Sequence, residues 1–260
     1  MLKIGFIGAG NMAQAMIQGW SSLDEVRQAV YSPHSAKAVA QKLGIEAVET
    51  AAELVQMSDL VVIATPPAQL AEVAAEIKPF LSGKVVISIL GGVSLSKLAE
   101  QLGVDTLIIR ALPNVNVAVQ QGYTAMAVSA TVDVEVKGAV FGLLTVLGRV
   151  DEFAEAQFGA VSALAGSGPA FVAGFIQALS AAGITAGIDA ETAEQLAIQT
   201  AQGTLAKMTQ DKLAPRELAE QVMTPGGSTA AGWQVMEDQN LVQLVSDVIQ
   251  ATMKKNAEFE

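Results

Sequence analysis

Apolar positions in the first part of the chain come in short runs that alternate with stretches of helical spacing. This alternation is typical of a parallel sheet covered by helices. The predicted strands are Lys3–Ile7, Gln28–Tyr31, Leu60–Ala64, Val85–Ile89 and Leu107–Ala111, with Tyr123–Val128 and Arg149–Phe153 as later additions. Helices between them are predicted, for example, at Met12–Trp20, Ala36–Leu43, Leu70–Lys78 and Val134–Leu147.

Beyond Glu155 the strand-like runs stop, and alanine-rich helical spacing continues to the C-terminus. The predicted helices are Gly159–Ala165, Pro169–Ala182, Ala190–Met208, Pro215–Met223, Thr229–Glu237 and Leu241–Ala257. The predicted fold class is therefore an α/β N-terminal Rossmann-like, doubly wound domain over residues 1–155, followed by an all-α C-terminal dimerisation domain over residues 156–260. A helical domain so poor in aromatic residues is expected to complete its core with a second copy, giving a homo-oligomer that is at least a dimer.

Composition narrows the possible partners. The formal net charge of −11 argues against nucleic acid and against an anionic membrane surface. The chain has no cysteine, which excludes disulfides and thiolate metal sites, and no metal site is predicted. The N-terminal residues lead straight into a strand pattern without the layout of a signal peptide, so a cytoplasmic location is expected.

One long uncharged stretch lies between Glu155 and Asp189. We expect it to be interrupted by a turn at Gly166-Ser167-Gly168-Pro169. Its most apolar part, Ala170–Ile176, is shorter than the ~20 residues that a membrane span needs. The stretch is therefore predicted to be a helix within a domain or subunit interface.

A dinucleotide-binding motif directly follows the first strand. Its sequence is Gly-Ala-Gly-Asn-Met-Ala, in which the first glycine permits a tight turn and the second lets the backbone approach a pyrophosphate. The final alanine lets the helix pack closely on the strand, and the helix N-terminus attracts the phosphates. The predicted contacts are Gly8, Ala9, Gly10, Asn11, Met12 and Ala13.

The end of the second strand favours NADP over NAD. NAD-preferring sites carry an acidic residue about 20 residues past the glycines, and this chain has none there. Hydroxyls of Ser32 and Ser35, with His34 and Lys37 nearby, can instead accept a 2′-phosphate. NADPH is predicted as the preferred cofactor, with NADH possible because no arginine supplies a bidentate clamp.

Two further segments are candidate cofactor contacts by their position. Ala64, Thr65, Pro66 and Pro67 close a strand at the carboxyl edge of the sheet, where such folds bind ligands. Pro113 and Asn114 follow another strand and are candidates to face the nicotinamide. The alternative for each segment is an ordinary turn.

A turn in the helical half is a candidate anion site. Two consecutive glycines before a helix can direct several backbone N–H groups at one carboxylate. An ordinary helix cap by the hydroxyl residues is the alternative. The candidate substrate contacts in this turn are Thr224, Gly226, Gly227, Ser228 and Thr229.

The shortage of proton donors bears on the reaction. Beyond residue 150 the chain has no histidine, cysteine or tyrosine, whereas a ketone or alcohol oxidoreductase normally needs a positioned acid or base. A cyclic imine can arrive already protonated, so an imine substrate is favoured. Acidic residues such as Glu217 and Glu220 stay open as donors.

These motifs together resemble the pyrroline-5-carboxylate reductase family. The segment Glu217–Glu237 is similar to its signature around a Ser/Thr-Pro-Gly-Gly-x-Thr core, and Leu164–Phe171 is similar to its Gly-Ser-Gly-Pro-Ala-aromatic helix start. Arg110–Asn114 resembles its Arg-x-x-Pro-Asn segment, and the N-terminal glycine loop agrees. The resemblance covers essentially the whole chain, and the Pro-Gly-Gly segment is highly specific.

The resemblance implies hydride transfer from NAD(P)H to the C=N bond of 1-pyrroline-5-carboxylate, giving L-proline. It implies that the Thr224–Thr229 turn holds the substrate carboxylate and that Thr229 is the catalytic residue, with a hydrogen bond near the ring nitrogen. It also implies cofactor contacts at Gly8 through Ala13, Ser32 and Ala64–Pro67, and a helical domain that dimerises.

Two departures concern the cofactor site. The family usually has Val-Lys-Pro where this chain has Thr65-Pro66-Pro67, and Ala51 stands where a cofactor-contacting Asn is common. Two other functions stay open: a reductase like the hydroxyacid dehydrogenases, and a non-catalytic NADP-binding sensor. The first would need a catalytic lysine on the early helices of the second domain, and residues 159–201 contain none.

Overall fold

The computed structural model describes residues 1–259, with only the backbone described at residue 259. The chain divides into two compact units, one made of residues 1–167 with the segment from Thr252 onward, and the other made of residues 168–251. Phe158 and Ala163 are buried, and Phe158 packs in a small core with Ala125 and Ala127. The segment after Glu155 therefore belongs to the first unit, and the domain boundary predicted at residue 155 stays a prediction.

The first unit is built on an eight-stranded sheet in the order β3-β2-β1-β4-β5-β6-β7-β8. Neighbouring strands are parallel except β6 and β7, which are antiparallel. The strands are β1 (Leu2–Ile7), β2 (Val26–Tyr31), β3 (Glu46–Ala47), β4 (Leu60–Ile63), β5 (Val85–Ser88), β6 (Leu107–Pro113), β7 (Gly122–Val128) and β8 (Gly148–Glu152). The seven predicted strands are all present; the pattern does not predict β3, because two residues show no periodicity.

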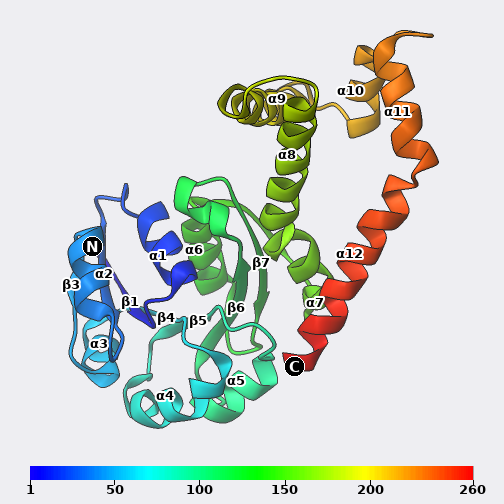
Figure 1. Ribbon diagram of the computed structural model, residues 1–260. Coiled ribbons are helices and arrows are strands. Elements are labelled where there is room, and N and C mark those ends of the chain that lie inside the picture. The colour runs from blue at the N-terminus through cyan, green and yellow to red at the C-terminus, as the bar shows by residue number, and fades with distance from the viewer. Residues whose placement is uncertain (260) are drawn as a thin grey trace. The chain divides into compact units, whose positions relative to one another are not determined.

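Helices cover both faces of the sheet (Figure 1). On one face α1 (Asn11–Gly19), α2 (Ala36–Leu43) and α6 (Val134–Thr145) bury their apolar sides in a core that includes Met16, Trp20 and Leu144. On the other face α3 (Ala51–Met57), α4 (Leu70–Ile77) and α5 (Leu95–Leu102) form a second core around Leu54 and Ile77. Because helices cover both faces of a mostly parallel sheet, the predicted doubly wound Rossmann-like fold is confirmed.

Local side chains fix where several helices begin. Thr50, Ser94 and Asp133 each accept the backbone N–H three residues on, and so cap α3, α5 and α6. Asp189 caps α9 in the same way. Each cap satisfies one of the N–H groups that a helix leaves unpaired at its start.

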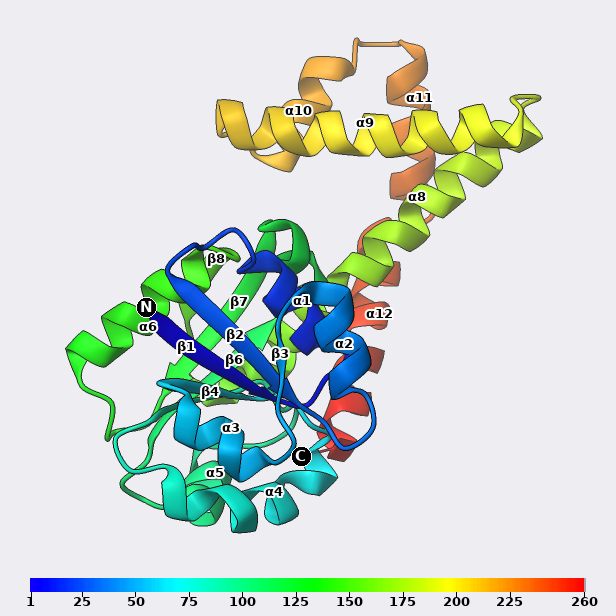
Figure 2. The same ribbon diagram turned by 90° about the vertical axis from the view of Figure 1, so that its left-hand side faces the viewer.

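The second unit is helical, with α8 (Gly168–Thr185), α9 (Ala190–Asp211), α10 (Pro215–Val222) and α11 (Ser228–Asp238). The last helix, α12 (Leu241–Asn256), starts in this unit (Figure 2). Small residues let α8 and α9 pack closely, since a Cβ on Gly183 would lie 3.2 Å from the Cβ of Ala193. Many large apolar side chains stay exposed in the single chain, among them Val172, Phe175, Leu179, Leu196 and Leu205. The helical C-terminal half is thus confirmed, and in the single chain it exposes a large apolar surface.

The predicted turn at Gly166-Ser167-Gly168-Pro169 is reduced to a bend at Ser167, between a π-helical turn and the start of α8 at Gly168. Helical backbone continues from α7 (Phe158–Val161) through a π-helical turn (Ser162–Gly166) into α8. Ser167 donates its backbone N–H to the carbonyl of Ser162 at 3.0 Å. A wider π turn is one way in which a helix accommodates residues that break the regular bonding, such as Pro169.

The continuous helical segment Glu155–Thr185 is 31 residues long. Contrary to the expectation from Ala170–Ile176 alone, length and composition would let this segment cross a membrane, and it is the one such helix in the part of the chain that the structure describes. The core helix of a soluble protein can meet the same criterion. The absence of a membrane span and the cytoplasmic location therefore stay predictions.

Candidate functional site

The first glycine of the N-terminal loop is required by the backbone. Gly8 has φ of +109°, a conformation that L-residues rarely adopt, and its N–H donates to the carbonyl of Tyr31 at 2.8 Å. A Cβ on Gly8 would lie 2.5 Å from the carbonyl oxygen of Ala64. The loop can therefore pass close to the end of β4 only with glycine at this position.

The second glycine leaves room on the outside of the loop. A Cβ on Gly10 would meet no protein atom within 4 Å. Gly10 caps α1 without any side-chain hydrogen bond, and the first turn of α1 has no acidic residue. The N–H groups at this helix start are therefore open to an anion. Asn11 is exposed and Met12 half-buried, whereas Ala13 is buried and packs the helix on the sheet.

A hollow of about 570 Å³ lies at the carboxyl ends of β1, β2 and β4. It brings together seven of the predicted cofactor residues, namely Gly8, Ala9, Gly10, Ser32, Ala64, Thr65 and Pro66. Tyr31, Glu72 and Glu76 also line it. Burial first, and then the negative charges of Glu76 and Glu72, raise the pKa of the Tyr31 phenol, so it stays neutral near pH 7.

The β2 end of this hollow carries hydroxyls. Ser32 and Ser35 share a hydrogen bond of 2.9 Å between their Oγ atoms, and His34 lines the hollow beside them. Lys37 instead forms an ion pair of 3.0 Å with Glu49, and both side chains are largely exposed. Lys37 is therefore paired with Glu49. The polar groups of this loop that can contact a ligand in the hollow are the two serines and His34.

A buried hydroxyl without a partner lies in the same hollow. Oγ1 of Thr65 is buried and makes no hydrogen bond with the described residues. A buried polar atom normally has a partner, and an oxygen or nitrogen of a ligand in the hollow would supply one. Together with the open N–H groups after Gly10, this atom shows that the residues present fit a dinucleotide.

Asn114, at the end of β6, uses its side chain in hydrogen bonds within the protein. Asn114 is 6% exposed, and its Oδ1 accepts the backbone N–H groups of Asn116 and Tyr123. Its Nδ2 donates to the carbonyl of Ala165 at 3.0 Å. Asn114 therefore links β6 to the π-helical turn, and a nicotinamide contact by Pro113 or Asn114 stays a prediction.

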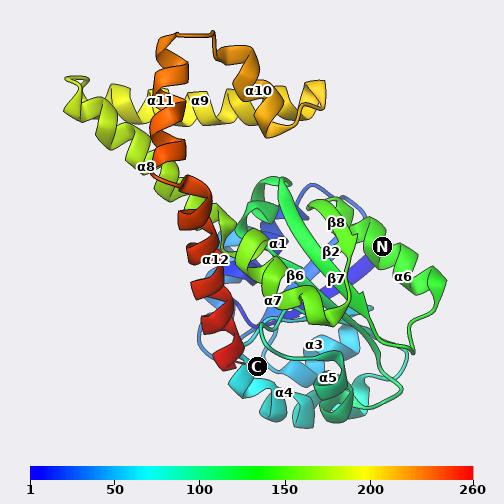
Figure 3. The same cartoon turned by 90° about the vertical axis from the view of Figure 1, so that its right-hand side faces the viewer.

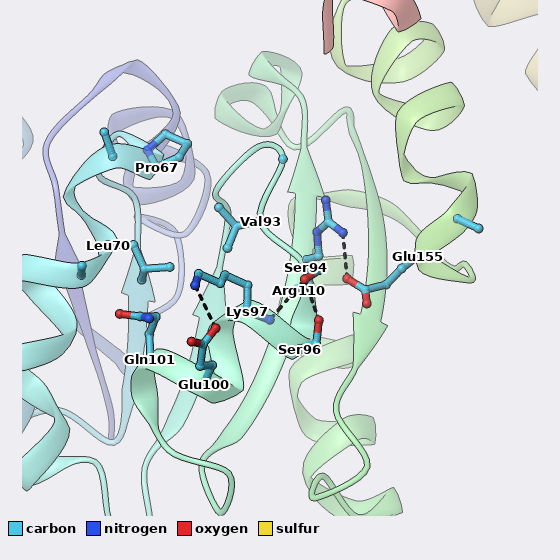
Figure 4. Close-up of a pocket in the computed structure, with 14 residues that line it drawn as sticks. Pro67, Leu70, Val93, Ser94, Ser96, Lys97, Glu100, Gln101, Arg110 and Glu155 are labelled. Carbon is cyan, nitrogen blue, oxygen red and sulfur yellow. Dashed lines mark hydrogen bonds and ion pairs between the residues drawn. The ribbon is translucent and has the colours of Figure 1, made fainter. Parts of the chain in front are cut away.

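Two further hollows follow along the carboxyl edge of the sheet. One, of about 500 Å³, is lined at β4 by Pro66 and Pro67 and at β5 by Gly91 and Gly92. The other, of about 820 Å³, lies between the starts of α4 and α5 (Figure 4). Arg110 on β6 lines both of them.

Arg110 is held from two sides. Its Nη1 donates to Oε1 of Glu155 at 2.7 Å (Figure 4). Its guanidinium carbon lies 4.4 Å from the ring centre of Phe158. The arginine side chain is 6% exposed and that of Glu155 is 32% exposed. In the sequence, only the family resemblance points to Arg110. No local pattern points to Glu155 or Phe158, because they contact Arg110 from 45 and 48 positions further along the chain.

The Pro-Gly-Gly turn of the second unit forms an open helix start. Gly226 has φ of +72°, and the N–H of Gly227 donates to the carbonyl of Thr224 at 2.9 Å. Gly227 caps α11 without a side-chain hydrogen bond, and the first turn has no acidic residue. Ser228 and Thr229 are exposed and make no capping bond. The alternative of an ordinary hydroxyl cap is therefore wrong, and the N–H groups here are open to an anion.

The carboxylates near this turn have structural partners. Oε2 of Glu217 accepts the N–H of Ala214 at the start of α10. Glu220 pairs with Arg216 at 2.8 Å, and Arg216 also reaches Glu237 at 3.2 Å. These contacts occupy the two carboxylates that the sequence leaves open as proton donors.

Profiles of two known families match the chain. A family described as pyrroline-5-carboxylate reductase dimerisation matches residues 155–259. A family described as NADP oxidoreductase, coenzyme F420-dependent, matches residues 3–92.

Individual relatives match over their full length. The chain is 30% identical to pyrroline-5-carboxylate reductase 2 of Bacillus subtilis, covering 100% of this chain and 96% of the relative. It is 33% identical to pyrroline-5-carboxylate reductase of Escherichia coli, covering 98% and 97%. Among solved structures, the Plasmodium falciparum pyrroline carboxylate reductase with NADP bound has a TM-score of 0.90 at 27% identity, covering 99% and 98%. The Coxiella burnetii pyrroline-5-carboxylate reductase also has a TM-score of 0.90, at 30% identity over 99% and 98%.

Proposed function

The chain belongs to the pyrroline-5-carboxylate reductase family, and on that premise we propose that it reduces 1-pyrroline-5-carboxylate to L-proline with NADPH. The observation that carries this proposal is the full-length similarity together with the dinucleotide hollow of the first unit. The profile match to a dimerisation domain supports a homo-oligomer, which we propose to be a dimer or a multiple of one.

The first unit holds the cofactor. The N–H groups after Gly10 bind the pyrophosphate, and Gly8 keeps the loop against β4. The hydroxyls of Ser32 and Ser35 receive the 2′-phosphate. Bound NADPH supplies the hydride that the C=N carbon of the substrate accepts.

The second unit holds the substrate anion. The open N–H groups of the turn before α11 bind the carboxylate, where they oppose the negative field of a chain with net charge −11. Thr229 places its hydroxyl near the ring nitrogen. Because the substrate arrives as the iminium ion, addition of hydride gives the neutral amine without a proton from the protein. Orientation and electrostatic complementarity then account for catalysis.

The alternatives predict different behaviour. A reductase like the hydroxyacid dehydrogenases would need a lysine on the early helices after Glu155, and residues 159–201 contain none. A non-catalytic sensor would bind NADPH without consuming it. The sensor has no use for an open anion site at Thr224–Thr229.

The test follows loss of NADPH absorbance on addition of pyrroline-5-carboxylate, with proline identified as the product. Thr229→Ala is expected to lower kcat/KM about 10- to 100-fold, the loss of one hydrogen bond to a charged group. Thr209→Ala is the matched control, because Thr209 bonds only its own helix, at the carbonyl of Leu205. A folded oligomer that binds NADPH and never oxidises it would instead establish the sensor.

A further inference from the structure

The hollow of about 500 Å³ adjoins the dinucleotide hollow, and Pro66 lines both. A dinucleotide bound with its 2′-phosphate at Ser32 and its pyrophosphate at Gly10 extends from β2 across β1 toward β4. Its nicotinamide end therefore reaches the carboxyl ends of β4 and β5, where this second hollow lies.

The lining of this hollow suits an uncharged flat ring. Prolines, glycines, Leu112 and Phe158 make most of it. Gly91 leaves open space, because a Cβ there would meet no atom within 4 Å. The positive charge of Arg110 is matched by Glu155, and its buried Nε has no hydrogen-bond partner among the described residues. The wall is therefore mostly apolar, with one N–H donor of Arg110 unused.

A polar pair on the wall, Asn256 and Ser162, can also make further hydrogen bonds. The end of α12 lies beside α7 (Figures 1 and 3), and Nδ2 of Asn256 donates to Oγ of Ser162 at 3.2 Å. Both residues are half-buried and both line the hollow. Oδ1 of Asn256 accepts no hydrogen bond from any residue that the structure describes. Asn256 thus has an unused acceptor and a second N–H beside an apolar hollow.

We propose that Asn256 positions the nicotinamide ring by pairing its side-chain amide with the carboxamide of the cofactor. Two amides can exchange one N–H···O bond in each direction, so the pairing fixes which way the ring lies. Ser162 holds the Asn256 side chain in place through Nδ2. This inference rests on the proposed function, since it assumes that the dinucleotide occupies the first hollow.

The test compares two ligands in the full-length protein by calorimetry. NADPH carries the nicotinamide, and 2′-phospho-ADP-ribose lacks it but keeps the pyrophosphate and the 2′-phosphate. Asn256→Ala is expected to weaken NADPH about 10-fold, the loss of one or two neutral hydrogen bonds, and to leave 2′-phospho-ADP-ribose unchanged. Asn256→Asp keeps the shape and an acceptor, so it is expected to lose less affinity.

Gln250→Ala is the matched control, because it removes an amide from the exposed side of the same helix, where Gln250 bonds Ser246. Equal loss for both ligands, no loss for either, or a rise only in the KM for pyrroline-5-carboxylate would overturn the role of Asn256. A wild-type protein that binds both ligands and does not reduce pyrroline-5-carboxylate would overturn the proposed function while leaving the ligand comparison valid.

Discussion

Nη1 of Arg110 lies 2.7 Å from Oε1 of Glu155, and the same carboxylate oxygen accepts the backbone N–H of Leu95 at 2.9 Å. One carboxylate thus joins strand β6, the start of α5 and the segment that follows β8. Because Arg110 also packs on Phe158, this contact holds in place the helical turn that lines the proposed nicotinamide hollow.

Removal of Glu155 should cost more stability than removal of Arg110. Glu155→Ala leaves a nearly buried guanidinium without a counter-ion, and we expect a loss of about 2–3 kcal/mol, between the values for exposed and fully buried pairs. Arg110→Met leaves a carboxylate that water can still reach, and should cost about 1–2 kcal/mol. Urea unfolding at fixed protein concentration measures both. Lys97→Ala, which breaks an exposed pair, is the control, and a reversed order would contradict the argument.

Alanine at Gly8 and alanine at Gly10 should have different effects, the first on stability and the second on NADPH affinity. Gly8→Ala forces a Cβ into the Ala64 carbonyl and should lower the melting temperature. Gly10→Ala meets no protein atom, so the fold should survive, while NADPH affinity falls about 10-fold because the methyl group stands where the pyrophosphate approaches. Melting curves with NADPH titrations separate the two effects. Gly138→Ala, on an open face of α6, should change neither ligand affinity nor fold, and unaltered affinity in Gly10→Ala would refute the loop assignment.

A carboxylate at the end of β2 should reverse the cofactor preference. Ser32→Asp places a negative charge where we assign the 2′-phosphate, and an acidic residue here can instead bind the ribose hydroxyls of NADH. We expect kcat/KM for NADPH to fall at least about 10-fold, whereas kcat/KM for NADH should stay the same or rise. Glu49→Gln is a useful companion, because it frees Lys37 without adding charge at Ser32. An equal fall for both cofactors would place the 2′-phosphate elsewhere.

Both tyrosines should lose their phenol protons at a higher pH than free tyrosine does. Burial raises the pKa of Tyr31, with Glu76 and Glu72 adding to the shift, and burial followed by the hydrogen bond to Asp151 raises the pKa of Tyr123. Phenolate absorbance should therefore appear above pH ~10 in the folded protein and near 10 after unfolding. Each raised pKa contributes stability that is present below pH ~10 and is lost as pH rises through the folded value. In a Tyr123→Phe background, Glu72→Gln should move the Tyr31 midpoint down. In the wild-type protein, a folded midpoint at or below ~10 would contradict both shifts.

The sequence predicts the seven longer strands and the glycine loop because each depends on residues close together in the chain. Strand Lys3–Ile7 is a short run of mostly apolar residues, and the positive φ of Gly8 is a property of the loop's own backbone. The π-helical turn at Ser162–Gly166 is different. Gly166 and Pro169 look locally like a turn, and the structure places a π-helical turn and a bend at Ser167 there, which no residue pattern predicts.

Local pattern in this chain therefore determined the fold class, the glycine loop after β1 and the Pro-Gly-Gly turn before α11, since a few adjacent residues set each of them. Only the tertiary structure brought Arg110 to Glu155 and Asn256 to Ser162. Those partners are 45 and 94 positions apart. No local pattern carries such pairings, because the free energy of folding comes mainly from burying apolar side chains, such as Phe158 against Ala125 and Ala127, and not from the paired residues themselves.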